Sequence, residues 1–314
     1  MKRLLSHLIL IIATLLPFSS AQADHRDILV VQSAPIKAYD EVFAGFSAEL
    51  QTLPPSGLKS IQPRTIDRVI LQKSDPKQLS SFVKHQPDFF IAIGGKALSL
   101  VKNAKVPIIY LLVPDPEAIA ESRPNISGIS MVIEPARQLE IMAQIFPTVK
   151  KIGVIHDPAR TGPLVKKGAA FAAQTDLDLI VREVSAPKEL YSNLDILRGK
   201  IDAYWMVPDL TVITPQTIES IGLFSINNRV PILTFAEKYL ENGAAVAISP
   251  DLRELGVQAA KIVHRIIAGN PFEQIAPQPV NQIKVVVNHK IIKKMGLAIN
   301  PDFTADITLI SGEK

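Results

Sequence analysis

The chain has 314 residues, of which 47% are hydrophobic and 20% are charged, and its formal net charge is +4. This length exceeds what one compact core usually accommodates, so two lobes are expected. The chain contains no cysteine, which excludes disulfide bonds, thiolate metal sites, a cysteine nucleophile and a lipid-modified amino-terminal cysteine. Basic residues are scattered along the chain and form no strip, which argues against nucleic-acid binding.

The first 23 residues have the layout of a secretory signal peptide. Lys2 and Arg3 precede an apolar run over residues 8–16, and residues 21–23 read Ala-Gln-Ala, which fits a cleavage site. The apolar run is shorter than the roughly 20 residues that span a bilayer, and an uncleaved membrane anchor is the alternative. We therefore expect residues 1–23 to be a signal peptide and the mature chain to be periplasmic, soluble and not lipidated.

From Asp24 onward, short β-rich runs alternate with helical stretches, which is typical of a mostly parallel sheet covered by helices. Residues 28–31 form an aliphatic run that suits a buried strand, and apolar residues then recur at helical spacing up to Leu50. Further strands are predicted at residues 68–71, 89–93, 108–113, 152–155, 179–184, 203–207 and 231–235. Helices are predicted at residues 135–145 and 255–267, where apolar side chains recur along one side.

Two stretches of the chain share the same order of features. Residues 87–112 and 201–235 each contain an acidic residue, an apolar strand, a polar loop, a helix and a Val-Pro-Ile that opens another strand. Two lobes of like topology would produce this repeat. Because Val-Pro-Ile is also a common opening of a buried strand, coincidence is the alternative.

Three segments are the places where the chain is expected to pass between the lobes. The first is a proline-rich loop and short β-like run within residues 114–133, the second is 244–250, and the third is 278–284. They predict a first lobe of residues 24–127 plus 251–280, and a second lobe of residues 128–250 plus 281–314. The expected fold is therefore α/β, with two Rossmann-like lobes whose parallel sheets are joined by a three-strand hinge. Closure of such a hinge around a ligand turns binding into a change of shape.

At NISGIS and at AVAISPDLRELGVQAAKIVHRIIAGNP, the sequence resembles the ABC-transporter substrate-binding family of the tryptophan/tyrosine-binding type. VPIIYLLVPDPEA, IDAYWMVPD and the ending VVVNHKIIKKMGLAINP carry the same resemblance, which covers nearly all of the chain after the predicted signal. It implies the type I periplasmic binding-protein fold. It also implies an extracytoplasmic receptor, expected to be a monomer, that hands a small molecule, often an amino acid, to an ABC permease in the inner membrane.

The sequence departs from this family at two positions. Lys96 stands where the family usually has a small or hydroxyl residue, and Leu210 stands where a polar residue is frequent. Both changes fall where a ligand would sit. The resemblance therefore supports the fold more strongly than it supports the identity of the ligand.

Ligands of α/β sheets sit beyond the carboxyl ends of the strands, so residues that end strands and start helices are the candidates. In the first lobe these are Ser33, after the first strand, and Gly95, Lys96 and Ala97, after the strand at 89–93. The helix that starts there has free amides that could receive a carboxylate, and Lys96 would add positive charge. The alternative is a tight glycine turn with Lys96 in solvent.

In the second lobe, Asp157, Asp209 and Phe235 occupy the matching strand ends, and Ser130 lies on the first crossing. Asp209 could accept hydrogen bonds from a ligand ammonium group. Helix capping or turn formation is the alternative for both aspartates. Trp205, the only tryptophan, lies in the middle of a predicted strand and is expected in the core.

Local signatures of catalysis and of cofactor binding are absent from the sequence. It contains no HExxH, GxSxG, GxGxxG or Walker A motif, so no enzyme activity, no cofactor and no metal ion are expected. His156 beside Asp157 is the only pair that resembles an acid–base arrangement, and neighbours in a strand point to opposite faces. Two alternatives remain open: a periplasmic sensor that presents its ligand state to a membrane signalling partner, and an exported enzyme with an unfamiliar site.

Overall fold

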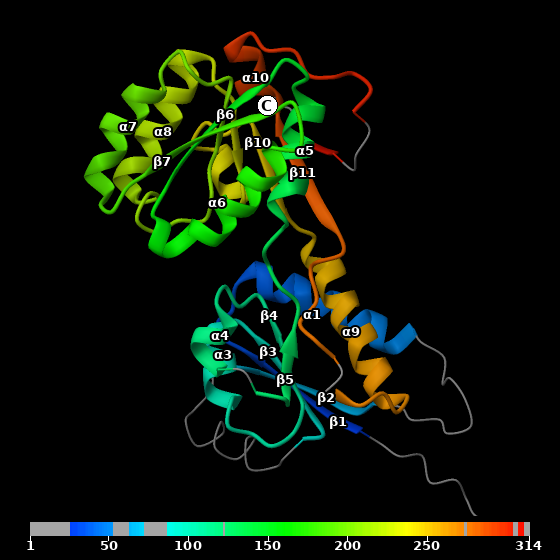
Figure 1. Ribbon diagram of the computed structural model, residues 1–314. Helices are drawn as coiled ribbons and strands as arrows, with labels where there is room; N and C mark the ends of the chain where they lie inside the picture. Colours follow the sequence, from blue (N-terminus) through cyan, green and yellow to red (C-terminus); the bar gives the residue numbers. More distant parts are fainter. Residues whose placement is uncertain are drawn as a thin grey trace, which may run out of the picture.

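The computed structural model describes residues 26–52, 63–71, 87–121, 123–272, 275–303 and 307–310, so the predicted signal peptide lies outside the described residues. The elements form two lobes, each built on its own sheet and joined by a narrow connection (Figure 1). None of the helices in the described segments is long and apolar enough to cross a bilayer.

The first lobe is built on a five-stranded parallel sheet in the order β2-β1-β3-β4-β5. Its strands are β1 (Arg26–Gln32), β2 (Pro63–Ile70), β3 (Phe89–Ile93), β4 (Ile108–Leu111) and β5 (Ile126–Gly128). Helices α1 (Lys37–Thr52) and α9 (Leu252–Ile267) pack on one face, and α3 (Gly95–Val101) and α4 (Pro116–Ala120) pack on the other. Because both faces are covered, every residue of β3 and β4 is buried.

The second lobe is built on a seven-stranded sheet in the order β12-β11-β10-β9-β8-β6-β7, in which only the β10–β11 pair is antiparallel. Its strands are β6 (Lys151–His156), β7 (Asp178–Glu183), β8 (Ala203–Trp205), β9 (Ile232–Thr234), β10 (Val246–Pro250), β11 (Ile283–Asn288) and β12 (Ile307–Ile310). Its helices are α5 (Pro135–Ile145), α6 (Pro158–Ala172), α7 (Leu190–Leu197), α8 (Pro215–Asn228) and α10 (His289–Met295), with short 3-10 helices at Pro187–Glu189 and Glu237–Leu240. Helices α5 and α6 pack on one face of the sheet, and α7 and α8 pack on the other.

Each strand predicted from the sequence overlaps a strand of the structure, and the helix predicted at 135–145 has the same bounds as α5. The strand predicted at 108–113 is too long, because Leu112 has a left-handed backbone with φ of 54° and ends β4 at Leu111. The strand predicted at 203–207 ends at Trp205. The strand predicted at 68–71 starts earlier, at Pro63, because this edge strand is too polar in its first half for a hydrophobic pattern to show it.

The structure shows a helix cap at the second crossing and confirms the predicted core position of Trp205. Asp251 caps α9, since its Oδ1 accepts a hydrogen bond from the Glu254 backbone N–H at 3.0 Å. Trp205 is fully buried in the core of the second lobe, where its indole Nε1 donates to Gln138 Oε1 at 2.9 Å.

The chain passes between the two sheets three times, at residues 129–134, 250–251 and 278–282. The first and third crossings run side by side, because Ile129 and Gln278 form a parallel bridge and the Ser130 N–H donates to the Gln278 carbonyl at 2.8 Å. The predicted lobe limits at residues 127, 250 and 280 lie close to these crossings, and as domain limits they stay a prediction.

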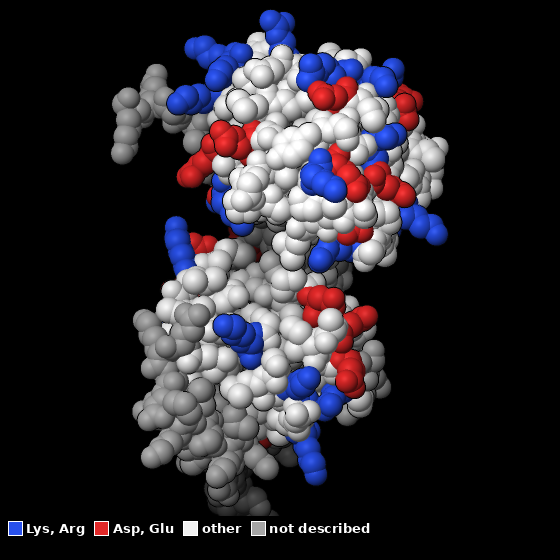
Figure 2. All heavy atoms as spheres, turned by 90° about the vertical axis from the view of Figure 1, so that its left-hand side faces the viewer, with Lys and Arg blue, Asp and Glu red and all other residues white. Residues whose placement is uncertain are grey.

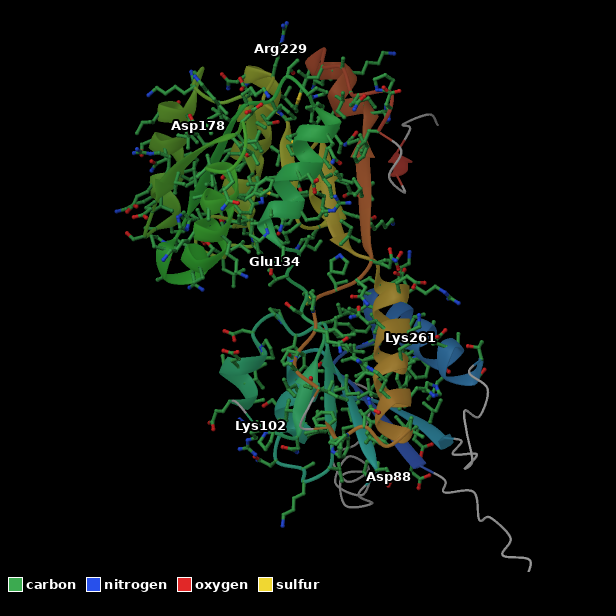
Figure 3. The ribbon with its side chains drawn as sticks, turned by 45° about the vertical axis from the view of Figure 1, so that its right-hand side comes forward. Asp88, Lys102, Glu134, Asp178, Arg229 and Lys261 are labelled. Carbon is green, nitrogen blue, oxygen red and sulfur yellow. The ribbon has the colours of Figure 1, made fainter. Side chains whose placement is uncertain are left out.

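The strand directions decide which ends of the sheets face each other. Strand β10 runs parallel to β9, β8 and β6 and leads directly into α9 of the first lobe, so the carboxyl ends of these strands point toward that lobe. Strand β5 likewise runs parallel to β4, β3 and β1 and leads into the second lobe. Figure 3 agrees: Asp88, before β3, and Arg229, before β9, lie at the outer ends of the molecule, whereas Glu134 lies between the lobes.

The loops that follow β1, β3 and β4 in one lobe and β6, β8 and β9 in the other therefore lie on the sides where the lobes face each other. We call them the facing loops. In the space-filling view, the surface narrows to a waist between the lobes, and charges of both signs are interspersed on this side of the molecule (Figure 2).

Candidate functional site

In the first lobe, Ser33 and the turn after β3 form one compact unit. The Ser33 N–H donates to the Ile93 carbonyl at 2.9 Å, and its Oγ accepts from the Ala97 N–H at 2.9 Å. A Cβ on Gly94 would lie 2.6 Å from both Ser33 Oγ and Tyr39 OH, and Gly94 has φ of 89°. Only glycine fits this position, and the tight approach holds the start of α3 against the end of β1.

The site residues predicted in the first lobe fall into two groups that differ in their exposure to solvent. Ser33 and Ala97 are buried and bond to each other, so they shape the turn. Gly95 is partly exposed and Lys96 is exposed, so these two are the residues of the turn that face solvent. Lys96 makes no ion pair with any residue that the structure describes.

Tyr39 is a residue of this unit that sequence reasoning missed. It is partly buried against Gly94, and burial raises the pKa of its phenol, so the hydroxyl is neutral at physiological pH. A neutral phenol can both donate and accept a hydrogen bond. In the sequence, Tyr39 is an aromatic residue near the start of a helix, and this pattern alone does not indicate a function.

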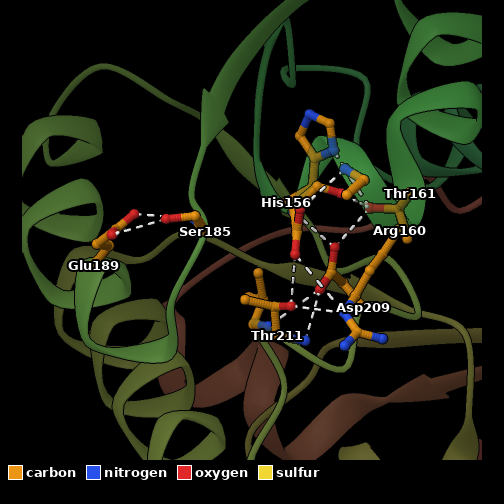
Figure 4. Close-up of polar contacts among 10 residues, drawn as sticks. His156, Arg160, Thr161, Ser185, Glu189, Asp209 and Thr211 are labelled. Carbon is orange, nitrogen blue, oxygen red and sulfur yellow. Dashed lines mark hydrogen bonds and ion pairs between the residues drawn. The ribbon is translucent and has the colours of Figure 1, made fainter.

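In the second lobe, a hydrogen-bond network joins the loops after β6 and β8 (Figure 4). Asp209 Oδ2 accepts from the Asp157 N–H at 2.8 Å and from Thr161 Oγ1 at 2.7 Å. Asp209 Oδ1 accepts from the backbone N–H groups of Thr211 and Val212 at 2.9 and 3.2 Å. The two loops are therefore fixed relative to each other by one carboxylate.

This geometry does not fit the direct ligand contact predicted for Asp209. The residue is 1% exposed, and both of its carboxylate oxygens already accept two hydrogen bonds each from the protein. A ligand ammonium group could not reach it without breaking the loop. The alternative interpretation, a carboxylate that organises turns, describes Asp209 correctly.

Asp157 lies nearer the surface of the same network, with 15% of its side chain exposed. It caps α6 through Oδ1, which accepts from the Ala159 N–H at 2.9 Å, and its Oδ2 accepts from Thr211 Oγ1 at 2.8 Å. The bond from Thr211 does most to lower the pKa of the Asp157 carboxyl, followed by the bond from Ala159 and the charges of Arg160 and His156. The Asp157 carboxylate is therefore ionised at physiological pH.

The lowered pKa of Asp157 predicts a pH-dependent contribution to stability. A carboxyl whose native pKa lies below its unfolded value stabilises the fold above about pH 4, and this stabilisation is lost as the pH falls through the native pKa. Asn is nearly as good a helix cap as Asp, so Asp157→Asn removes mainly the charge. We expect its melting temperature to lie below that of the wild type at pH 7 and the difference to shrink at pH 3. Thermal melts of both proteins at the two pH values measure this, and a constant difference would contradict it.

Arg160 is the second residue that sequence reasoning missed. It lies in the first turn of α6, where its Nε donates to Thr211 Oγ1 at 2.8 Å and lies 3.7 Å from Asp157 Oδ2, and its side chain is 53% exposed. A cation in the first turn of a helix opposes the helix dipole. That unfavourable placement was a signal in the sequence that the side chain has another task.

In the described part of the chain, no group of three or more histidine, aspartate or glutamate side chains could hold a metal ion. The polar groups on the facing loops are hydroxyls, ionised side chains and helix-start amides, which are groups that sites for small organic molecules use.

Comparison with known proteins identifies the family of the chain. Residues 30–306 match the family model described as ABC transporter substrate binding protein. The chain belongs to the ABC transporter substrate-binding protein family. Proteins of this family are extracytoplasmic, bind small-molecule ligands and work with a membrane permease.

Several relatives of this substrate-binding protein are known. A tyrosine-binding protein from Clostridioides difficile strain R20291 is 22% identical over 285 residues, which are 87% of this chain and 81% of that protein. Among solved structures, a ligand-free, open substrate-binding protein with adhesive properties from Clostridium difficile has a TM-score of 0.74 at 20% identity, covering 91% of this chain and 100% of that one. An ABC domain in complex with L-Trp from Streptococcus pneumonia has a TM-score of 0.59 at 20% identity, with the same coverage. These structures establish the type I periplasmic binding-protein fold.

The remaining predicted site residues of this substrate-binding protein lie at the edges of the facing loops. Phe235 follows β9, is partly buried and packs edge-on against Tyr239 with ring centroids 5.3 Å apart. Ser130 lies on the first crossing, where its Oγ accepts from the Val132 N–H at 3.2 Å. Leu210, at the tip of the loop after β8, is 75% exposed. The facing loops thus combine polar groups with exposed apolar side chains, as ligand sites do.

Proposed function

We propose that this chain is the periplasmic solute-binding component of an ABC importer. It binds a small amino-acid-like or carboxylate-bearing molecule between its lobes, acts as a monomer and catalyses no reaction. The observation that carries the proposal is the pair of preformed polar units on the facing loops, the Ser33–Ala97 turn in one lobe and the Asp157–Thr211 network in the other. The relatives named as tyrosine-binding or solved with L-Trp support a ligand of this class. The signal-like residues 1–23 support export.

Two buried glutamines support hinge closure around the ligand. Gln258, on α9, donates to the Pro279 carbonyl at 2.9 Å and accepts from the Asn281 N–H at 3.1 Å, which ties the third crossing to the first lobe. Gln138, on α5, donates to the Ile133 carbonyl at 2.7 Å, which ties the end of the first crossing to the second lobe. Between these anchors, near residues 131–132 and 282, the crossings bond within themselves or to each other: the Val132 N–H donates to Ser130 Oγ, and the Asp251 N–H donates to the Gln282 carbonyl at 3.0 Å. We expect rotation of the lobes to be centred on these parts of the crossings.

Screening the mature protein against the twenty L-amino acids and small carboxylic acids tests this function. We expect one chemical class to raise the melting temperature, with a gain in unfolding free energy of about 2.7 kcal/mol at a ligand concentration 100 times Kd. The radius of gyration in small-angle scattering should fall at the same concentration as the lobes close. Thermal stability is a better readout than tryptophan fluorescence, because Trp205 packs inside the second lobe against Gly168 and Gln138. No response to any compound would contradict the proposal.

A further inference from the structure

We propose that Arg160 is the ligand-recognition residue of the second lobe and that it binds a carboxylate of the solute. The inference rests on the proposed function, because it names the chemical group that the bound molecule must carry. It assigns to Arg160 the role that the sequence suggested for Lys96, and it makes the second lobe the anion-binding side of the site.

The most exposed hydrogen-bonding groups of the second-lobe network are donors, because Arg160 is 53% exposed and Asp157 only 15%. The carboxylate oxygens of Asp209 are buried, and those of Asp157 already accept from Ala159 and Thr211. In contrast, the two terminal Nη groups of Arg160 make no hydrogen bond or ion pair with any residue in the described segments. In Figure 4 they point away from the network. The exposed Nη groups of Arg160 therefore favour an acceptor, and a charged acceptor is favoured because the guanidinium is always protonated.

The network also holds Arg160 in a fixed orientation. Its Nε donates to Thr211 Oγ1, which donates in turn to Asp157 Oδ2, and Asp157 is itself fixed by its cap on α6. A guanidinium held at Nε can present its two Nη groups as a parallel pair of donors, and this fork matches the two oxygens of a carboxylate. Because the side chain is already ordered, less conformational entropy is lost when the ligand binds.

The position of Arg160 in the fold places this fork on the correct side of the lobe. Helix α6 begins at the carboxyl end of β6, which points toward the first lobe. Lys96 lies on a facing loop of the first lobe, but no described hydrogen bond orients its ammonium group. A flexible lysine is a weaker determinant of carboxylate geometry than an ordered arginine.

A variant pair with matched local geometry tests the inference. Arg160→Gln removes the fork, and Arg198→Gln is the control, because Arg198 is an exposed arginine of the same lobe that also pairs with an aspartate three residues before it, Asp195. The probes are the twenty L-amino acids, each amino acid that binds being paired with its decarboxylated amine, such as L-tyrosine with tyramine. Affinities are measured by calorimetry. We expect the wild type and Arg198→Gln to bind the amino acid but not its decarboxylated amine. We expect Arg160→Gln to bind the amino acid at least about 30-fold more weakly than the wild type does.

The outcomes separate this inference from the proposed function. If Arg160→Gln binds the acid as tightly as the wild type, or if the wild type binds the amine equally well, the role of Arg160 is wrong while the proposed function stands. If the wild type binds neither an amino acid nor any of the small carboxylic acids of the screen above, both are overturned. Should Arg160→Gln melt well below the wild type without ligand, Arg160→Lys replaces it, since this variant keeps the charge but loses the fork. Its expected affinity lies between the other two, and wild-type affinity in Arg160→Lys would overturn the inference.

Discussion

Replacing Asp209 with alanine should lower the free energy of unfolding by about 3 to 4 kcal/mol and abolish ligand binding. The carboxylate accepts four hydrogen bonds inside the second lobe, three of them from backbone N–H groups of Asp157, Thr211 and Val212. Alanine leaves these donors buried without acceptors, and each such group costs about 1 to 3 kcal/mol if the loop does not rearrange. A rearranged loop would relieve part of this cost but would release Arg160 from its fixed position, and we expect this release to abolish binding.

Asp202 provides the matched control for this prediction. It belongs to the same lobe and also accepts from two backbone N–H groups, those of Lys150 and Lys151, at 3.0 and 2.8 Å. It is exposed, however, so water can replace its oxygens. Asp202→Ala should therefore cost about 1 kcal/mol or less and leave binding unchanged. Urea denaturation of the two variants measures both losses, and equal losses would show that the burial of Asp209 has no special role.

The fold could be predicted from the sequence because its strands are buried on both faces. Residues 89–93 are continuously apolar, and this pattern placed β3 at its observed bounds. The same criterion failed in the first half of β2, an edge strand whose polar residues carry no such signal. It also failed at Leu112, whose left-handed backbone ends β4 within an apolar run, because hydrophobicity does not report φ.

The site was predictable only in part, because strand ends can be read from the sequence whereas side-chain partners cannot. Asp157 and Ser33 directly follow strand ends as expected, and Asp209 lies in the loop after β8. Asp209 is buried because Thr161, on α6, and the Thr211 N–H, two residues further along the same loop, donate to it, and neither threonine has a pattern of its own in the sequence. The importance of Arg160 follows from the same contacts, since its free Nη groups become evident only once Thr211 is seen to hold its Nε.

The first and second lobes differ in how their facing loops are held. In the first lobe, backbone proximity fixes the turn, because Gly94 lets Ser33 and Tyr39 approach α3 closely. In the second lobe, charged hydrogen bonds fix the loops, and the ordered arginine belongs to that network. In the proposed mechanism, a ligand that engages the second lobe first would therefore meet the ordered Arg160 and would complete its contacts when the first lobe closes over it.

The largest stability effect in the first lobe is expected at Gly256 in α9. A Cβ at this position would lie 2.1 Å from the Val42 carbonyl oxygen, and one at Gly45 would lie 2.0 Å from the Arg253 carbonyl oxygen, so the backbones of α1 and α9 touch at two glycines. Gly256→Ala must push the helices apart. We expect it to lower the free energy of unfolding by about 3 kcal/mol, although alanine favours helix formation by about 1 kcal/mol over glycine.

Gly162→Ala in α6 separates these two effects. It is also a helical glycine, but an added Cβ there would meet only Pro158 Cβ, at an ordinary 3.8 Å. The melting temperature of Gly162→Ala should equal or exceed that of the wild type, while that of Gly256→Ala should fall by several degrees.

The Gly256→Ala substitution should also affect lobe closure, because α9 directly follows the second crossing. Loosening the contact of α9 with α1 should weaken the coupling between ligand binding and lobe closure, and this should appear as a smaller ligand-induced change in the radius of gyration. Equal melting temperatures for the two variants would mean that the α1–α9 contact is not as close as the structure shows.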